Sequence, residues 1–161
     1  MILDADALNR ISKSNLGSEF FLERKSQTWI TPHKDEFMRL FPEIDCVNRV
    51  ELAKKVAREF NLSILLKGAN SIIADNEKAW QLFGTDPQTA RAGLGDLLSG
   101  FVAGSSAIDL TFCRNIKTDF LAKYVLLHSF AASQCKSGSN ASSINDELSK
   151  LVRNKKMRQI S

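Results

Sequence analysis

The chain has 161 residues, of which 43% are hydrophobic and 25% charged, and its formal net charge is +4. That length fits one domain with a core that needs no disulfide or metal staples. With 8 glycines and 3 prolines, low-complexity and collagen-like classes are excluded. No apolar run approaches the roughly 20 residues that span a bilayer. Asp4 and Asp6 stand where a secretory signal would carry Lys or Arg, so we expect a cytoplasmic protein.

Basic residues gather near the end of the sequence, at Lys150, Arg153, Lys155, Lys156 and Arg158. Nucleic-acid binding is disfavoured because no aromatic residues are interleaved and charges at a chain end are commonly solvated. We therefore expect one domain over residues 1–152 and a basic tail over 153–161, with no nucleic-acid or membrane partner. The three cysteines lack CxxC spacing, so reduced, packed thiols are predicted rather than a disulfide framework or a zinc site.

The first sixty residues predict strands alternating with helices. The expected elements are a strand at 2–3 running into a loop, a loop or poorly formed helix at 12–20, a strand at 28–31, and helices at 34–41 and 47–60. Pro32 and Pro42 end the second strand and the first helix. Asn48 and Glu51 have the spacing of a capping box, and Glu51 and Lys55 form a favourable i,i+4 pair.

The remaining residues predict a hairpin followed by helices. The expected elements are strands at 63–66, 71–75 and 78–83, a loop at 84–93, and helices at 96–108, 116–134 and 144–152. The continuous apolar run at 63–66 is typical of a strand buried on both faces, as in a parallel sheet. Asp75-Asn76 indicates the hairpin turn. The order predicts an α/β fold with ligands beyond the carboxyl ends of its strands.

A glycine-rich segment precedes the predicted helix at 96–108. Gly93 and Gly95 leave backbone N–H groups at the positive end of the helix dipole, which is suited to a phosphate or to an oxyanion in phosphoryl transfer. Asp96 in the first turn is placed to accept a proton from an attacking hydroxyl. The alternative is that Asp96 caps the helix and the glycines only form a turn. Gly100 and Gly104 are expected to allow close packing of the helix against a neighbouring element.

A second candidate site follows the buried strand at 63–66. Lys67 at the end of that strand contacts either an anion such as a nucleotide phosphate or solvent. Gly68 would let the backbone approach such a ligand. His33 is either a helix-end hydrogen-bonding residue or a site residue, whereas His128 is expected to be a satisfied core or boundary residue. Asp4 and Asp6 follow the first strand. They would either bind magnesium or a ligand hydroxyl, or cap a helix.

Four segments in this order resemble one family: ILDADALN at 2–9, TPHKDEF at 31–37, LKGANS at 66–71 and GLGDLLSG at 93–100. They are similar to the ADP/ATP-dependent NAD(P)H-hydrate dehydratases, which are ribokinase-like proteins related to carbohydrate kinases. The resemblance implies a three-layer α/β/α sandwich. It also implies a lyase that phosphorylates hydrated NADH or NADPH on its ring hydroxyl with ADP or ATP and Mg²⁺, and restores the cofactor as phosphate leaves.

The resemblance also implies roles for individual residues. His33 and Asp96 would contact the hydrated cofactor, with Asp96 as the catalytic base. The adenine nucleotide would be held by Lys67, Gly68, Ala69, Asn70, Ser71 and Gly95. No residue set is expected to form a dedicated metal site.

The similarity starts at a strand from the middle of the family's domain, so we expect an N-terminally truncated fold. Either a separate chain supplies the missing half, or the sequence is a fragment of a decayed or split gene. Because an unpaired sheet edge favours pairing, we also expect self-association or poor stability. Two other functions remain open. One is a small-molecule kinase of the same superfamily, and the other is an inactive nucleotide-binding module.

Overall fold

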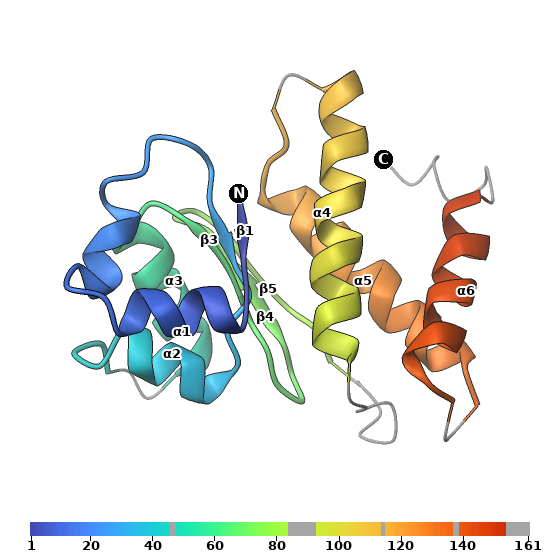
Figure 1. Cartoon of the computed structure of the whole chain (residues 1–161), viewed down its shortest axis with the longest axis horizontal. Coiled ribbons are helices and arrows are strands. Elements are labelled where there is room, and N and C mark those ends of the chain that lie inside the picture. Colours follow the sequence, from blue (N-terminus) through green and yellow to red (C-terminus); the bar gives the residue numbers. More distant parts are fainter. Residues whose placement is uncertain (46–47, 84–92, 114, 137–138, 154–161) are drawn as a thin grey trace. The chain divides into compact units, whose positions relative to one another are not determined.

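The computed structural model describes residues 1–45, 48–83, 93–113, 115–136 and 139–153. The chain divides into two compact units, Met1–Gly84 and Thr85–Ser161. The first unit is drawn in blue and green in Figure 1, and the helices of the second run from yellow-green to red.

The first unit is a mixed α/β unit built on a five-stranded sheet. Its elements are β1 (Ile2–Leu3), α1 (Asp6–Ser12), the 3-10 helix η1 (Gly17–Phe21), β2 (Trp29–Ile30), α2 (Lys34–Leu40), α3 (Arg49–Glu59), β3 (Ser63–Leu66), β4 (Ile72–Ala74) and β5 (Ala79–Gln81). The strand order is β1-β2-β3-β4-β5. The pairs β1–β2 and β2–β3 are parallel, and β3–β4 and β4–β5 are antiparallel. The predicted parallel strands and the predicted hairpin are both confirmed.

Helices α1, α2 and α3 lie together on one side of this sheet (Figure 1). The core between them and the sheet takes alternate residues of β3, Ile64 and Leu66, because successive side chains of a strand point to opposite faces. Four phenylalanines pack in the same core, with ring centroids 5.0 to 6.3 Å apart: Phe21, Phe37, Phe41 and Phe60. All four residues of β3 are buried, as the apolar run predicted.

Local features of the first unit differ from the sequence predictions in several places. Residues that were expected to continue β1 as a loop instead form α1, because Leu8 is fully buried in the core and Ile11 packs against it. In α3, Glu51 forms its ion pair with Lys54, at 3.7 Å, rather than with Lys55. Asn48 does cap α3, since its Oδ1 accepts a hydrogen bond from the Val50 N–H at 2.8 Å, but it does not form the predicted capping box with Glu51.

The described residues of the second unit form three helices, α4 (Leu94–Phe112), α5 (Thr118–Gln134) and α6 (Ala141–Arg153). They share a core formed by α5 and α6 residues, against which Leu94, Leu97 and Phe101 of α4 pack. The close packing expected at Gly100 and Gly104 is wrong, because a Cβ at either position would meet no atom within 4 Å.

Within the described residues, no helix is long and apolar enough to cross a membrane. Cys113 and Cys135 are free thiols, as predicted. Cys46, most of the predicted 84–93 loop and the basic tail beyond Arg153 lie outside the described residues.

Candidate functional site

The three parallel strands end together at one edge of the sheet. Two hydrogen bonds extend the ladder past the strand ends: Thr31 N–H donates to Leu3 O at 3.1 Å, and Lys67 N–H donates to Pro32 O at 2.8 Å. These bonds hold the segments after β1, β2 and β3 side by side. The polar residues that the sequence placed at this edge are therefore brought together within the first unit.

Lys67 and Asp4 form an ion pair across this edge. The Lys67 Nζ lies 2.8 Å from Asp4 Oδ1, and the side chains are only 23% and 11% exposed. Since β2 lies between β1 and β3, the ion pair spans the end of the middle strand. The sequence analysis expected Lys67 to contact either an anion, such as a nucleotide phosphate, or solvent. In this structure its partner is an anion, the carboxylate of Asp4.

Ala5, directly after Asp4, has a backbone conformation that residues with a side chain rarely adopt, with φ 46° and ψ −115°. Strained residues of this kind persist only where the surrounding structure fixes them, and they cluster at ligand and active sites. The strain marks the connection between β1 and α1 as part of a candidate site.

His33 caps α2 at the same edge. Its Nδ1 accepts hydrogen bonds from the N–H groups of Asp35 at 3.1 Å and Glu36 at 3.5 Å, while the His33 N–H donates to Glu36 Oε2 at 2.9 Å. The helix-end role is therefore real, and because Nδ1 is an acceptor the neutral ring carries its proton on Nε2. The side chain remains 48% exposed, which leaves the ring accessible to a ligand.

The connection from β3 to β4, residues 67–71, is a compact loop with its own hydrogen bonds. Ser71 Oγ accepts from the Gly68 N–H at 3.3 Å and donates to Gly68 O at 3.0 Å. Arg49, the first residue of α3, donates from Nη1 to Asn70 O and from Nη2 to Lys67 O, both at 3.3 Å. Sequence reasoning missed Arg49, because no local pattern links it to a loop 18 to 21 residues away.

The second unit contains the N-terminus of α4. Gly93 is its N-cap residue, with a left-handed φ of 80°, and Gly95 and Asp96 lie in the first turn. Asp96 is exposed. Its carboxylate has no hydrogen-bond or ion-pair partner among the residues that the structure describes, so it does not cap the helix there. The first N–H groups of a helix have no intrahelical partner, which is the property that an anion site requires.

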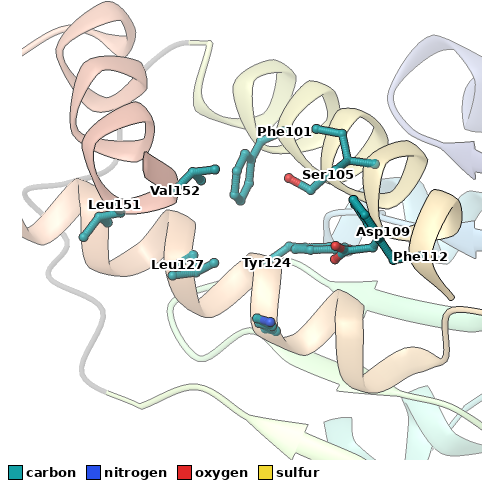
Figure 2. A pocket seen from close by; sticks show the side chains of 10 residues that line it. Phe101, Ser105, Asp109, Phe112, Tyr124, Leu127, Leu151 and Val152 are labelled. Atoms are coloured by element: carbon teal, nitrogen blue, oxygen red, sulfur yellow. The ribbon is translucent and has the colours of Figure 1, made fainter. Parts of the chain in front are cut away.

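The same unit holds a cavity of about 490 Å³ that contains none of the predicted site residues. Figure 2 shows apolar side chains such as Phe101 and Leu151 around it, and Tyr124 pointing toward Asp109. The Tyr124 hydroxyl donates to Asp109 Oδ2 at 2.6 Å, and burial together with this bond raises the pKa of Tyr124.

His128, on α5, is buried as expected, but its Nε2 has no hydrogen-bond partner in the described part of the chain. Burial without a partner lowers the pKa of His128 to about 4. This histidine is therefore neutral at physiological pH, and the expectation of a satisfied polar residue is wrong for that nitrogen.

No group of three or more His, Cys, Asp or Glu side chains could hold a metal ion in the described ranges. A magnesium ion carried on nucleotide phosphates needs one or two protein carboxylates and keeps several waters, so the present residues fit only that kind of site.

A family model described as NAD(P)H-hydrate dehydratase matches residues 1–155. The chain belongs to this family, as its four motifs predicted. A bifunctional NAD(P)H-hydrate repair enzyme of Synechocystis is 38% identical over 105 residues, which cover 65% of this chain and 20% of that enzyme. An ADP-dependent (S)-NAD(P)H-hydrate dehydratase of Nitrosopumilus maritimus is 34% identical over 107 residues, 64% of this chain and 37% of the relative.

Solved structures confirm the ribokinase-like α/β fold. A ribokinase-like superfamily protein of Enterococcus faecalis aligns with a TM-score of 0.72 at 24% identity, over 92% of this chain and 50% of that one. An ADP/ATP-dependent NAD(P)H-hydrate dehydratase of Bacillus subtilis, co-crystallised with ATP and Mg²⁺, aligns with a TM-score of 0.66 at 23% identity, over 92% and 52%. The chain thus spans about half of these structures and 20% to 37% of these curated relatives.

Proposed function

We propose that the chain takes part in the ADP- or ATP-dependent dehydration of hydrated NADH or NADPH, which restores the reduced cofactor. The observation that carries this proposal is the position of loop 67–71 at the carboxyl edge of the parallel strands, where Asp4 and His33 also lie. The loop is held by hydrogen bonds from Arg49 and with Ser71. In open α/β sheets this edge is where ligands bind. The family to which the chain belongs acts on hydrated NAD(P)H, and an ADP-dependent relative supports the choice of nucleotide.

The residues would divide the chemistry as follows. Lys67 to Ser71, with Gly95, hold the adenine nucleotide, and His33 contacts the hydrated nicotinamide ring. Asp96 accepts the proton of the ring hydroxyl while the hydroxyl oxygen attacks the terminal phosphorus and the bond to the leaving nucleotide breaks. The N–H groups at Gly93 and Gly95 stabilise charge on the transferred group. The ring then loses a proton and phosphate, and the carbon–carbon double bond of the dihydronicotinamide returns.

Magnesium would arrive with the nucleotide, where it neutralises phosphate charge. Asp4 contacts the loop of residues 67–71, which is the nucleotide loop of this proposal, through its ion pair with Lys67. A phosphate that draws Lys67 away would release Asp4 to hydrogen-bond a water or a ligand hydroxyl. Because these substrates are cofactors of central metabolism, a cytoplasmic location belongs to the proposal.

The proposal includes a partner, either a second copy or another chain. β1 lies at the edge of the sheet and has two half-buried residues. Among the described residues β1 pairs on one side only, and an edge strand of this kind is a site for strand addition. In this proposal residues 1–152 act as one domain, and 153–161 form a basic appendage.

The first experiment is a thermal melt of the full chain with and without Mg²⁺ and ADP or ATP. Nucleotide at 100 times its dissociation constant should stabilise the chain by about 2.7 kcal/mol. A cooperative melt that is insensitive to nucleotide would contradict the nucleotide site.

The second experiment assays dehydration of hydrated NADH through the absorbance of the restored dihydronicotinamide. Asp96→Asn should lower the rate by about 10²- to 10⁴-fold with nucleotide binding retained. Asp146→Asn, an exposed carboxylate on α6, is the matched control and should leave the rate unchanged. Binding without turnover in the wild-type chain would identify an inactive nucleotide-binding module, and a stable phosphorylated alcohol would identify a kinase.

A further inference from the structure

Arg49 closes the nucleotide loop from outside. Its guanidinium donates to the carbonyl oxygens of Lys67 and Asn70, which stand at opposite ends of the turn, each at 3.3 Å. Ser71 closes the loop from within, through its two hydrogen bonds with Gly68. The planar guanidinium suits this role because it presents several N–H donors in a fixed arrangement.

The absence of a side chain at Gly68 leaves room for the guanidinium of Arg49. A Cβ on Gly68 would lie 2.8 Å from Arg49 Nη2, closer than real Cβ atoms approach other atoms, and 3.1 Å from Nη1. Because the guanidinium ends a flexible side chain, it is the group that would move. Gly68 has no left-handed φ, unlike Gly17 and Gly93, so its backbone does not itself require glycine. The guanidinium of Arg49 is the obstacle that a side chain at position 68 would meet.

Charge at the loop also depends on Arg49. The positive charge of Lys67 is compensated by Asp4 at 2.8 Å. Arg49 is exposed and has no carboxylate partner within the described ranges of the chain. Its charge lies against two carbonyl oxygens, whose partial negative charge would otherwise repel a phosphate.

We propose that Arg49 is the positioning residue of the nucleotide loop, and that Gly68 is glycine so that Arg49 can lie against it. This inference rests on the proposed function, because the loop is a nucleotide loop only if that function holds. In it, Arg49 fixes the carbonyls of residues 67 and 70 away from the phosphates and keeps the local potential positive.

The test measures ADP affinity by calorimetry for the full chain and for Arg49→Ala, Gly68→Ala and the double variant. Each single variant should weaken ADP binding about tenfold, since each removes the same pair of charge-assisted hydrogen bonds. The double variant should be no weaker than Arg49→Ala, because the three atoms nearest to the added Cβ all belong to the guanidinium that is then absent. Additive losses would overturn the proposal.

Two controls separate positioning from general stability. Arg58→Ala removes an exposed arginine from the last turn of the same helix and should leave ADP affinity unchanged. Arg49→Lys keeps the charge but loses the forked geometry, so it should restore only part of the affinity. Full restoration by lysine would mean that charge alone acts, and would overturn the positioning role.

A measurement without nucleotide distinguishes failure of this inference from failure of the proposed function. Hydrogen exchange at the amides of residues 67–71 should accelerate in Arg49→Ala and in Gly68→Ala, with no further acceleration in the double variant. If the wild-type chain binds no ADP but this pattern holds, the nucleotide function is wrong while the loop coupling stands. If exchange in the loop is unchanged by Arg49→Ala, the positioning role itself is wrong.

Discussion

The Lys67 ammonium and the Asp4 carboxylate, 63 residues apart in the sequence, form a 2.8 Å ion pair at the carboxyl edge of the sheet. Both side chains are largely withdrawn from solvent. Lys67, the phosphate-binding residue of the proposed site, is therefore paired with Asp4 in this structure. A nucleotide phosphate would have to replace that carboxylate as its partner.

Removing both partners of this ion pair should cost less stability than the sum of removing each alone. Asp4→Asn and Lys67→Met should each lower the free energy of unfolding by about 1–3 kcal/mol, because each removes the ion pair while the other charged side chain stays largely buried. The double variant should lose less than the sum, as measured by urea denaturation. Strict additivity would show that the two charges do not interact in solution.

The capping role of His33 can be separated from a ligand role by a serine substitution. His33→Ala should destabilise the chain by about 1 kcal/mol, because the N–H groups of Asp35 and Glu36 lose their acceptor. His33→Ser retains a side-chain oxygen suited to an N-cap and should keep nearly wild-type stability. If the ring also contacts the hydrated cofactor, His33→Ser will raise KM for that substrate. An unchanged KM would restrict His33 to its helix.

His128 should make the stability of the chain depend on acidity. Its pKa falls from an ordinary 6.5 to about 4 in the folded chain, so between these values the unfolded chain binds a proton that the folded chain does not. Stability contributed by the neutral ring is present above pH 6.5 and is lost as the pH falls toward 4, up to about 3 kcal/mol. Thermal melts from pH 7 to 4 should show this loss.

His128→Gln should flatten the pH profile of the melting temperature, whereas His33→Ser, which removes the only other histidine, should leave it in place. An identical profile in His128→Gln would show that carboxylates alone cause the acid sensitivity.

The glycines of α4 should respond in opposite directions to alanine. Gly93→Ala should destabilise the chain by about 1–2 kcal/mol, because the N-cap has a φ of 80° that disfavours a Cβ. Gly104→Ala should stabilise it by up to about 1 kcal/mol, since alanine is the better helix former and the added Cβ meets open space. Both are read from chemical denaturation. A loss of stability in Gly104→Ala would mean that this face of α4 is covered in solution.

The sequence predicted those features that short-range chemistry determines. The strand at Ser63–Leu66, the hairpin around Asp75 and the helix beginning after Asn48 each carry their signal within a few residues. The sequence left open a phosphate contact or a solvent-exposed ammonium at Lys67. It did not predict the ion pair, because the partner, Asp4, follows the first strand and lies 63 residues away.

Other features were missed because their causes are distant in the sequence. Only Leu8 and Ile11 mark the apolar side of α1, and their burial depends on helices and strands that follow much later. The contact of Arg49 with Gly68 depends on how α3 crosses back over the sheet, which no local pattern encodes. The unpartnered nitrogen of His128 likewise results from packing rather than from its own helix.

The mixed direction of the sheet has a consequence for the order in which the chain folds. β3, β4 and β5 are joined by short connections and pair antiparallel, so their contacts close small loops at little entropic cost. β1 and β2 pair parallel and must wait for the segments with α1, α2 and α3 to cross over. Since low contact order favours early formation, the hairpins should form first and the edge bearing Asp4 and His33 last. A folding intermediate of this unit would therefore contain the β3–β4 connection before the carboxyl edge with Asp4 and His33 has formed.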